Sequence, residues 1–426
     1  MSLVMANASP PPFPVVNRGP LEGVVVLDFT TQLSGPLATY LLAGLGATVI
    51  KIEEPKGDPV RGYAPFVDPE GLLTMWKEHA DAMSLPILNR GRGKHSITLN
   101  LKTPEAREIY RKLASRADVV VENYAGGTAD RIGIGYEATR AINPRIIYCS
   151  LSGFGADAMG NRKALDVVIQ AMSGIAMASG IEDGPPVRVG MPIADTIAPL
   201  FAVMGISAAL HRRHATGDGE YIDISMLGSL TALLAVEDWQ AMEHVGTPTR
   251  TGNHLLRATP FGLFTCADGS IAIGAGARDP FCHALFRIMG RPEMSEDPRY
   301  ATLPERCKRQ HELNALVEAW CAGRAVDQVE RELLEAGIPV AKVRTPAQAV
   351  QDPLVSQRRE VVDVVHPDLG AVQGLKTIGL PVRFRRTEYG HGAAAPRLGE
   401  HNGAIYGDWL GLDDSILAAW KAAGVL

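Results

Sequence analysis

The segment from Val24 to Glu53 constrains the fold more than any other part of the chain. It contains an apolar run (VVVLDFT), a helix-like run (GPLATYLLAGLG) and a second apolar run (ATVIKIE). This pattern predicts a parallel βαβ unit, and strands that are apolar along both faces are usually covered on both sides. An amphipathic helix starting at Pro104 and the runs DVVVENY and RIIYCSLSGFG continue the alternation. The first half therefore predicts a Rossmann-like α/β domain.

Composition shifts divide the chain of 426 residues into five stretches. Residues 1–19 have Pro where a signal peptide needs an unbroken apolar run, so they are predicted to be a disordered leader. Residues 20–227 form the large Rossmann-like domain, 228–254 a linker helix, and 255–385 a smaller α+β domain with an antiparallel hairpin at Asp268–Gly269. Residues 386–426 are expected to return to the large domain.

Charge and cysteine usage limit the partners. A net charge of -5 gives no overall attraction to nucleic acid or to an anionic membrane. Five widely spaced cysteines without a CxxC pair indicate free thiols, a cytoplasmic protein and no zinc site. The most apolar stretch, Thr196 to Leu210, contains Pro199 and Gly205 and is shorter than the roughly 20 residues of a membrane span. We therefore expect a soluble protein with no metal.

Asp195, in GMPIADTIAPLFAVMG, is the only charged side chain between Arg188 and His211. Its first interpretation is structural: Asp is a preferred N-cap, and a helix beginning at Thr196 needs one. Its second is chemical. The N-terminus of that helix would lower the pKa of the carboxylate and keep it ionised in an apolar pocket, where it could act as a nucleophile.

A dinucleotide fingerprint is absent where it should stand, because the first βα turn reads DFTTQLSGP and lacks GxGxxG. A nicotinamide dehydrogenase is therefore disfavoured. Downstream, NRGRGKHS places three cations within five residues, and two more follow. A solvated basic loop and a clamp for phosphate groups both fit this spacing, and the sequence leaves them open. The five cations are Arg90, Arg92, Lys94, Lys102 and Arg131.

Seven segments, taken in order, resemble the family III (CaiB/BaiF) CoA-transferases, the group of formyl-CoA transferase and carnitine CoA-transferase. They run from residue 21 to the C-terminal region: PLEGVVVLDFTTQLSGP, LGATVIKIEEPKGDPVRGY, NRGRGKHSITLNLKTPEAR, ADVVVENYAGGTADRIGIGYE, NPRIIYCSLSGFG, GMPIADTIA and APRLGEHN. The resemblance implies a Rossmann-like large domain linked to a small domain. It also implies a homodimer of two interlocked ring-shaped chains.

The resemblance implies that Asp195 is the catalytic nucleophile. Its carboxylate would attack an acyl-CoA thioester to give an aspartyl anhydride and then an aspartyl-CoA thioester. CoA would pass from there to an acceptor carboxylic acid. Water must be excluded, because the anhydrides would otherwise hydrolyse. By the same resemblance, positions lining the CoA site are Leu33, Ser34, Leu99, Lys102, Asn123, Tyr124, Ala125, Arg131, Lys163, Asp166 and Met226, with Lys102 facing phosphate and Arg131 near the nucleotide.

Two positions depart from the family pattern. Glu54 stands where formyl-CoA transferases have an Arg that packs on the nucleotide, so adenine would be held differently or with help from Lys56 or Arg61. The glycine loop that closes over the carboxylate has no counterpart here, and Gly274–Ala275–Gly276 is interpreted as a hairpin turn. Formyl-CoA and oxalate are consequently disfavoured, whereas Arg257 or Arg278 could hold the distal carboxylate of a dicarboxylic acid.

Two other functions remain as alternative hypotheses. The α-methylacyl-CoA racemases share the fold and move a proton with a His-Asp pair, but Leu165 precedes Asp166 here, so one proton carrier is missing. A CoA-binding protein without catalysis is the third hypothesis, and the Asp195 segment argues against it.

Overall fold

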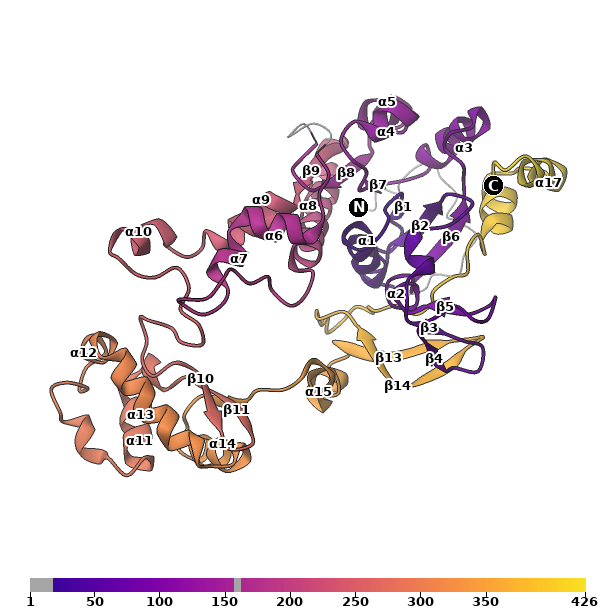
Figure 1. The fold of residues 1–426 in the computed structure, drawn as a ribbon. Coiled ribbons are helices and arrows are strands. Elements are labelled where there is room, and N and C mark those ends of the chain that lie inside the picture. Colours follow the sequence, from indigo (N-terminus) through magenta and orange to yellow (C-terminus); the bar gives the residue numbers. More distant parts are fainter. Residues whose placement is uncertain (1–17, 157–161) are drawn as a thin grey trace. The chain divides into compact units, whose positions relative to one another are not determined.

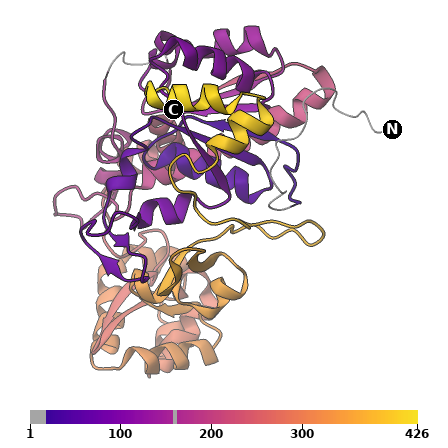
Figure 2. The same cartoon turned by 90° about the vertical axis from the view of Figure 1, so that its right-hand side faces the viewer.

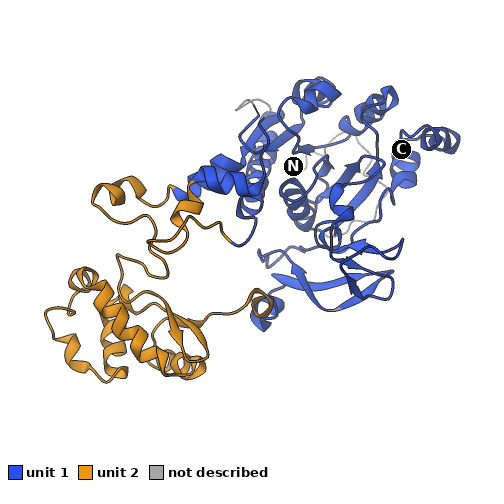
Figure 3. Cartoon of the chain, viewed as in Figure 1, with its two compact units in different colours: residues 1–173, 190–234, 350–426 blue, residues 174–189, 235–349 orange. Residues whose placement is uncertain are grey.

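The computed structural model describes residues 18–156 and 162–426, with the side chain of Gln373 left out. The predicted leader therefore lies almost entirely outside the described residues. The chain forms two compact units (Figures 1 and 3): unit 1 comprises residues up to 173, 190–234 and 350–426, and unit 2 comprises 174–189 and 235–349. The sequence-based boundaries at 227, 254 and 385 differ from this division, because residues 350–385 pack with the large unit.

A six-stranded parallel sheet forms the centre of unit 1, as the βαβ pattern predicts. Its strand order is β6-β2-β1-β7-β8-β9, and each neighbouring pair is parallel. β1, β7 and β8 are mainly apolar and buried, which suits strands covered on both faces, whereas β2 also buries Lys51 and Glu53 and the buried strand β6 is mostly polar. The strands are β1 (Val25–Asp28), β2 (Thr48–Glu53), β6 (Lys94–Thr98), β7 (Val119–Glu122), β8 (Ile147–Ser152) and β9 (Glu220–Ser225).

Helices cover the two faces of this sheet. On one face α1 packs on α8, and α8 also contacts β8, β9, α6 and α9. On the other face α3 and the C-terminal residues share a core with the strands, including Tyr110, Trp409 and Val425; Figure 2 shows the C-terminal segment lying across the sheet. The helices are α1 (Ser34–Gly44), α3 (Pro104–Ala114), α4 (Thr128–Ile132), α5 (Tyr136–Ile142), α6 (Asp166–Ser173), α8 (Ile193–Thr216), α9 (Met226–Leu234), the π-helix η4 (Gly403–Trp409) and α17 (Asp414–Ala422).

Shorter elements of unit 1 gather around a second core. The hairpin β13–β14 packs through Val364 and Val372 against Val67 and Ile87, which explains why residues 350–385 belong to this unit. The elements are η1 (Pro59–Gly62), β3 (Phe66–Val67), β4 (Leu73–Thr74), β5 (Met83–Ser84), α2 (Leu85–Arg90), α16 (Pro353–Gln357), β13 (Val361–His366) and β14 (Gly370–Ile378).

Unit 2 is a small α+β body with its own core. Its antiparallel sheet has the order β10-β11-β12, and the β10–β11 pairing closes at Cys266 and Gly269, one residue from the predicted turn. Helices α11, α13 and α14 bury Leu285, Val317 and Leu333 against it. The elements are α7 (Ile175–Ala178), α10 (Trp239–His244), β10 (Gly262–Cys266), β11 (Gly269–Ile273), η2 (Ala275–Ala277), α11 (Asp279–Ile288), η3 (Pro292–Ser295), α12 (Leu303–Lys308), α13 (Gln310–Ala322), α14 (Val326–Glu335), β12 (Val340–Lys342) and α15 (Pro346–Val350).

Helix α8 is longer than the sequence suggests. It has 24 residues, runs through Pro199 and ends at Gly217 in the left-handed conformation. In the described part of the chain it is the one helix long and apolar enough to cross a membrane by length and composition. It packs on α1, α9 and the sheet, but only 39% of its most apolar stretch is buried, and Leu200 and Met204 are exposed.

Candidate active site

Most of the residues that the sequence singled out follow the carboxyl ends of the parallel strands. In the order β6-β2-β1-β7-β8-β9 the sheet grows from β1 toward one edge through β2 and β6, and then from β1 toward the other edge through β7, β8 and β9. The order therefore reverses between β1 and β7. Ligands of open α/β sheets bind in the crevice at such a reversal point. Leu33 and Ser34 follow β1, and Asn123, Tyr124 and Ala125 follow β7, so these two loops flank the reversal point.

Asn123 ties the two flanking loops together. Its Oδ1 accepts a hydrogen bond from the backbone N–H of Thr31 at 2.8 Å, and its Nδ2 donates to the carbonyl of Thr31 at 2.9 Å. Both ends of the side-chain amide are therefore used within the protein. Asn123 thus sets the spacing of the two loops.

Asp195 lies in the first turn of α8, but it is not the N-cap. The helix begins at Ile193 after Pro192, which corrects the expected start at Thr196 and puts Asp195 at the third helical position. Asp166, the first residue of α6, supplies the capping carboxylate instead: its Oδ1 accepts the backbone N–H groups of Ala194 at 2.9 Å and of Asp195 at 3.4 Å.

This arrangement raises the pKa of Asp195 to about 6, whereas the sequence analysis expected a lowered pKa. Burial is the main cause, and the negative charge of Asp166 adds to it. The N–H groups that would have stabilised the Asp195 carboxylate donate to Asp166 instead. Within residues 18–156 and 162–426 no hydrogen-bond donor reaches the Asp195 side chain, so its oxygens are half-buried, ionisable and uncommitted.

Arg90, the last residue of α2, is the cation whose charge acts on Asp195. It opposes the rise in the pKa of Asp195, and Asp195 and Asp58 in turn favour the charged form of the guanidinium. Its Nη2 donates to the carbonyl of Gln32 at 3.3 Å, in the turn after β1, and its buried Nε has no partner among the residues that the structure describes. Arg90 therefore links the β1 turn to the carboxylate.

The three cations of NRGRGKHS do not act as one cluster, and Lys94 is committed to a buried polar network. Lys94 is fully buried, and its Nζ binds Asp28 at 3.0 Å and Thr39 at 2.7 Å below the β1 turn. Lys51, also buried, donates to the carbonyl of Thr30 at 2.8 Å. This buried polar network fixes the backbone of the turn.

The ammonium group of Lys102 is paired with the carboxylate of Glu54. The two exposed side chains form an ion pair of 3.1 Å beyond the ends of β6 and β2. Arg61 is held by two hydrogen bonds of 2.7 Å to Glu53, which removes it from the cations available to a nucleotide. An incoming phosphate group would compete with Glu54 for Lys102.

The remaining predicted residues differ in accessibility. Leu99 and Ser34 are buried, and no group in the described part of the chain pairs with the Oγ of Ser34. Ala125 and Lys163 are exposed, and exposed Arg131 on α4 donates to Thr128 at 2.7 Å. Met226 is buried at the start of α9, directly after β9, and Tyr124 packs half-buried against the main core.

The candidates in unit 2 are described within that unit. Gly274–Ala275–Gly276 is not a hairpin turn: β11 ends at Ile273, and the segment enters the short 3₁₀ helix η2. The backbone of Thr259 leaves no room for a Cβ at Gly276. Arg257 forms an ion pair of 2.7 Å with Glu237, and Arg278 lies over the ring of Phe281.

Two residues near Asp195 escaped the sequence analysis. Gln170, buried on α6, donates from Nε2 to Asp166 at 2.7 Å and to the carbonyl of Met191 at 3.1 Å, so it orients the capping carboxylate. Its i, i+4 spacing from Asp166 was a usable signal. Gln32, in the β1 turn, has a φ of 69°, which is uncommon for a residue other than glycine and gives no sequence signal.

Comparison with known proteins identifies relatives that match most of the chain. A profile of CoA-transferase family III matches residues 21–402. Succinyl-CoA--D-citramalate CoA-transferase of Chloroflexus aurantiacus is 36% identical over 96% of this chain and 98% of its own, and formyl-CoA:oxalate CoA-transferase of Streptomyces avermitilis is 35% identical over 95% and 99%. A crystal structure of a CaiB/BaiF family protein from Brucella suis has a TM-score of 0.79 with 32% identity, covering 92% of this chain and all of that one. The chain belongs to CoA-transferase family III.

Proposed function

We propose that this enzyme moves CoA from an acyl-CoA to a carboxylic acid through covalent intermediates on Asp195. The observation that carries the proposal is the division of labour between two neighbouring carboxylates. Asp166 accepts three hydrogen bonds and is occupied in the fold. Asp195, beside it, accepts none from the described residues, and its pKa of about 6 leaves it mostly ionised at neutral pH. A poorly hydrated, uncommitted carboxylate is a suitable nucleophile.

The reaction proceeds in four attacks. An Asp195 oxygen attacks the thioester carbonyl, the C–S bond breaks, and a mixed anhydride and CoA thiolate form. The thiolate attacks the aspartyl carbonyl, releasing the donor's carboxylate and leaving an aspartyl-CoA thioester. The acceptor carboxylate then displaces the thiolate to give a second anhydride. Finally the thiolate attacks the acceptor's acyl carbon, which yields the new acyl-CoA and frees Asp195.

The positive charge of Arg90 and its position near Asp195 suit it to assist this chemistry. Each attack develops negative charge on an oxygen next to Asp195, and a nearby cation stabilises such charge most where water is excluded. The guanidinium is half-buried, and its Nε–H group is unpaired within residues 18–156 and 162–426. We assign Arg90 to the stabilisation of the ionised nucleophile and of the entering acceptor carboxylate.

CoA is proposed to bind across the reversal point of the sheet. The loops after β1 and β7 flank it, and Arg131 and Lys163 are exposed cations for the phosphates. Lys102 would contribute once it leaves Glu54. The lining positions proposed are Leu33, Ser34, Leu99, Asn123, Tyr124, Ala125, Asp166 and Met226.

A dicarboxylic acid is the proposed acceptor. Relatives at 36% identity are named for succinyl-CoA with D-citramalate and with mesaconate, the latter from Haloarcula marismortui. A relative at 35% is named for formyl-CoA and oxalate, so identity alone does not separate the two groups. Within unit 2, Arg257 is already paired with Glu237 at 2.7 Å, which neutralises its charge.

We further propose an interlocked homodimer in the cytoplasm. The chain passes between the two units at four points, near residues 173, 189, 234 and 349. Such a path suits a ring-shaped protomer, and light scattering of the purified protein tests the dimer.

The reaction is tested with purified protein, succinyl-CoA and a panel of mono- and dicarboxylic acids. We expect a new acyl-CoA, none from Asp195→Ala, and a hydroxylamine-trapped adduct on the peptide containing Asp195. An adduct on another residue would refute the nucleophile assignment. Solvent deuterium at the α-carbon of a 2-methylacyl-CoA, without any acceptor, would favour racemisation instead, and CoA binding without either reaction would favour a non-catalytic role.

A further inference from the structure

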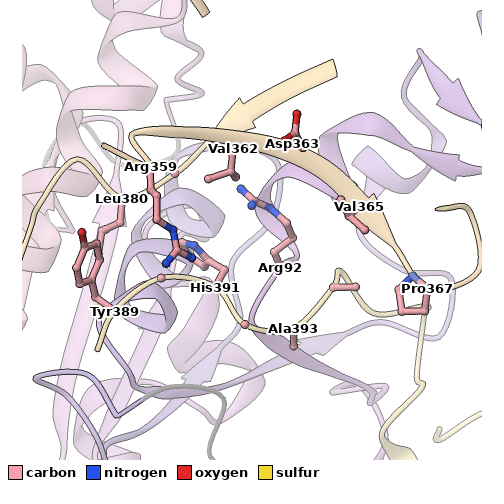
Figure 4. A pocket seen from close by; sticks show the side chains of 14 residues that line it. Arg92, Arg359, Val362, Asp363, Val365, Pro367, Leu380, Tyr389, His391 and Ala393 are labelled. Carbon is pink, nitrogen blue, oxygen red and sulfur yellow. The ribbon is translucent and has the colours of Figure 1, made fainter. Parts of the chain in front are cut away.

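A cavity of about 370 Å³ in unit 1 is separate from the candidate active site. Figure 4 shows its walls: strand β13 with Val362 and Val365, the segment after β14 with Leu380, and the Tyr389–Ala394 segment. Arg92 and Arg359 contribute the cations. A volume of this size lies in the range of small-molecule sites, which are largely apolar with a few placed polar groups.

The two guanidinium groups have no acidic partner. Arg92 donates to the hydroxyl of Tyr40 and to the carbonyl of Ile378, both neutral acceptors. Arg359 forms no ion pair or side-chain hydrogen bond with any residue that the structure describes. The one acid in the wall, Asp363, is already neutralised by Lys376 at 2.7 Å. The cavity is therefore lined by two guanidinium groups without an acidic partner among the described residues, that of buried Arg92 and that of exposed Arg359.

His391 adds no charge to the cavity. Burial lowers the pKa of its imidazole to about 3, so the ring is neutral at pH 7, and its Nε2–H donates to the carbonyl of Tyr40 at 2.7 Å. The ring stacks on Tyr40 at a centroid distance of 3.6 Å. The wall beside Arg92 is thus rigid, and a ligand would find it preformed.

The backbone at Arg359 is an independent observation. Its φ of 58° lies in the left-handed region, which glycine adopts without cost and other residues rarely do. Its carbonyl also abuts Gly379, where a Cβ would meet that oxygen. Strained residues of this kind cluster at ligand sites. A glycine would serve the turn better, so the guanidinium itself accounts for an arginine here.

The cavity lies away from the residues assigned to CoA. Arg92 precedes Lys94, the first residue of edge strand β6, whereas the CoA candidates follow the carboxyl ends of the strands. None of those candidates lines the cavity. A ligand held here would not occupy the site of acyl transfer.

We propose that this cavity binds a small organic dianion, whose two negative charges meet Arg92 and Arg359 while its carbon body rests on Val362, Val365 and Leu380. Guanidinium forks match carboxylate and phosphate oxygens equally in geometry. The shared chemistry is therefore a dicarboxylate or a phosphate monoester of modest size.

The test is calorimetric titration of the full-length protein, saturated with CoA to block the active site, with glutarate and with phenyl phosphate. At least one dianion should bind, and whichever binds identifies the source of the charge. Arg359→Ala should weaken that binding by about tenfold or more, the loss expected for a charged hydrogen-bonding partner. Arg358→Ala is the matched control, because Arg358 is adjacent, exposed and paired with Glu360, and it should change affinity less than about twofold.

Two results would overturn the proposal. They are the absence of binding for both dianions at about 10 mM and wild-type affinity in Arg359→Ala. Arg359→Ala should retain CoA transfer, which separates this site from the catalytic one.

Discussion

Replacing the proposed nucleophile by its neutral isostere should make the protein more stable as well as inactive. In Asp195→Asn the buried negative charge next to Asp166 is removed while the shape of the side chain is kept. The folded-state pKa of about 6 against an ordinary 3.8 is a difference of about two units, which corresponds to about 3 kcal/mol. The favourable field of the α8 N-terminus offsets part of this cost. We expect a net stabilisation of about 1–3 kcal/mol at pH 8.

The pH dependence of that gain distinguishes this cause from others. A carboxyl group with a raised pKa binds more protons in the folded than in the unfolded state between pH 3.8 and 6, so its cost to stability grows through that window as the pH rises. Below about pH 4 the group is protonated in both states. The difference between Asp195→Asn and the parent should therefore be near zero at pH 4 and reach its full value above pH 7.

Thermal and urea unfolding at several pH values measure this difference. Asp166→Ala is the matched control: it removes the neighbouring carboxylate that caps α8, and it should destabilise the protein by about 1–2 kcal/mol at neutral pH. Destabilisation by Asp195→Asn at pH 8, or a gain that is the same at pH 4 and pH 8, would refute the electrostatic account of this site.

Three further predictions concern the surroundings of the nucleophile. Arg90→Met removes the cation that holds down the pKa of the nucleophile, so the acid limb of kcat/KM, expected near pH 6, should move to higher pH; an unmoved limb would separate Arg90 from the reaction. Glu54→Gln frees Lys102 for phosphate and should lower the KM for acyl-CoA about two- to fivefold at low salt, whereas an unchanged KM would remove Lys102 from the CoA site. Asn123→Ala breaks both hydrogen bonds to Thr31, so it should raise the KM for acyl-CoA more than it lowers kcat and should lower the free energy of unfolding by about 1–3 kcal/mol. Steady-state kinetics and urea unfolding measure these effects. An unchanged KM together with an unchanged free energy of unfolding would contradict this role.

The local pattern of apolar residues was sufficient to predict the central strands and helix α3 of unit 1. The apolar runs around Leu27, Ile50 and Val120 became adjacent parallel strands, and the helix expected at Pro104 begins there. Such features are encoded within a few residues of one another. The domain boundaries depended on the hairpin at residues 361–378, which packs against residues some 300 positions earlier, and periodicity carries no information at that range.

The same limit applies to the charges. The sequence identified Asp195 as the charged residue of an apolar segment, but not that Asp166, 29 positions earlier, takes its helix N–H groups and reverses the direction of its pKa shift. It grouped Arg90, Arg92 and Lys94 as one cluster. The structure directs them to Asp195, to the cavity and to Asp28, respectively.

The sequence by itself determined the α/β class and singled out Asp195 as a candidate, because each depends on residue type and local spacing. Only the tertiary structure decided which carboxylate is free to react and which cations are free to bind. The physical reason is that a charged group's behaviour is set by the donors, acceptors and low-dielectric surroundings brought to it from distant parts of the chain.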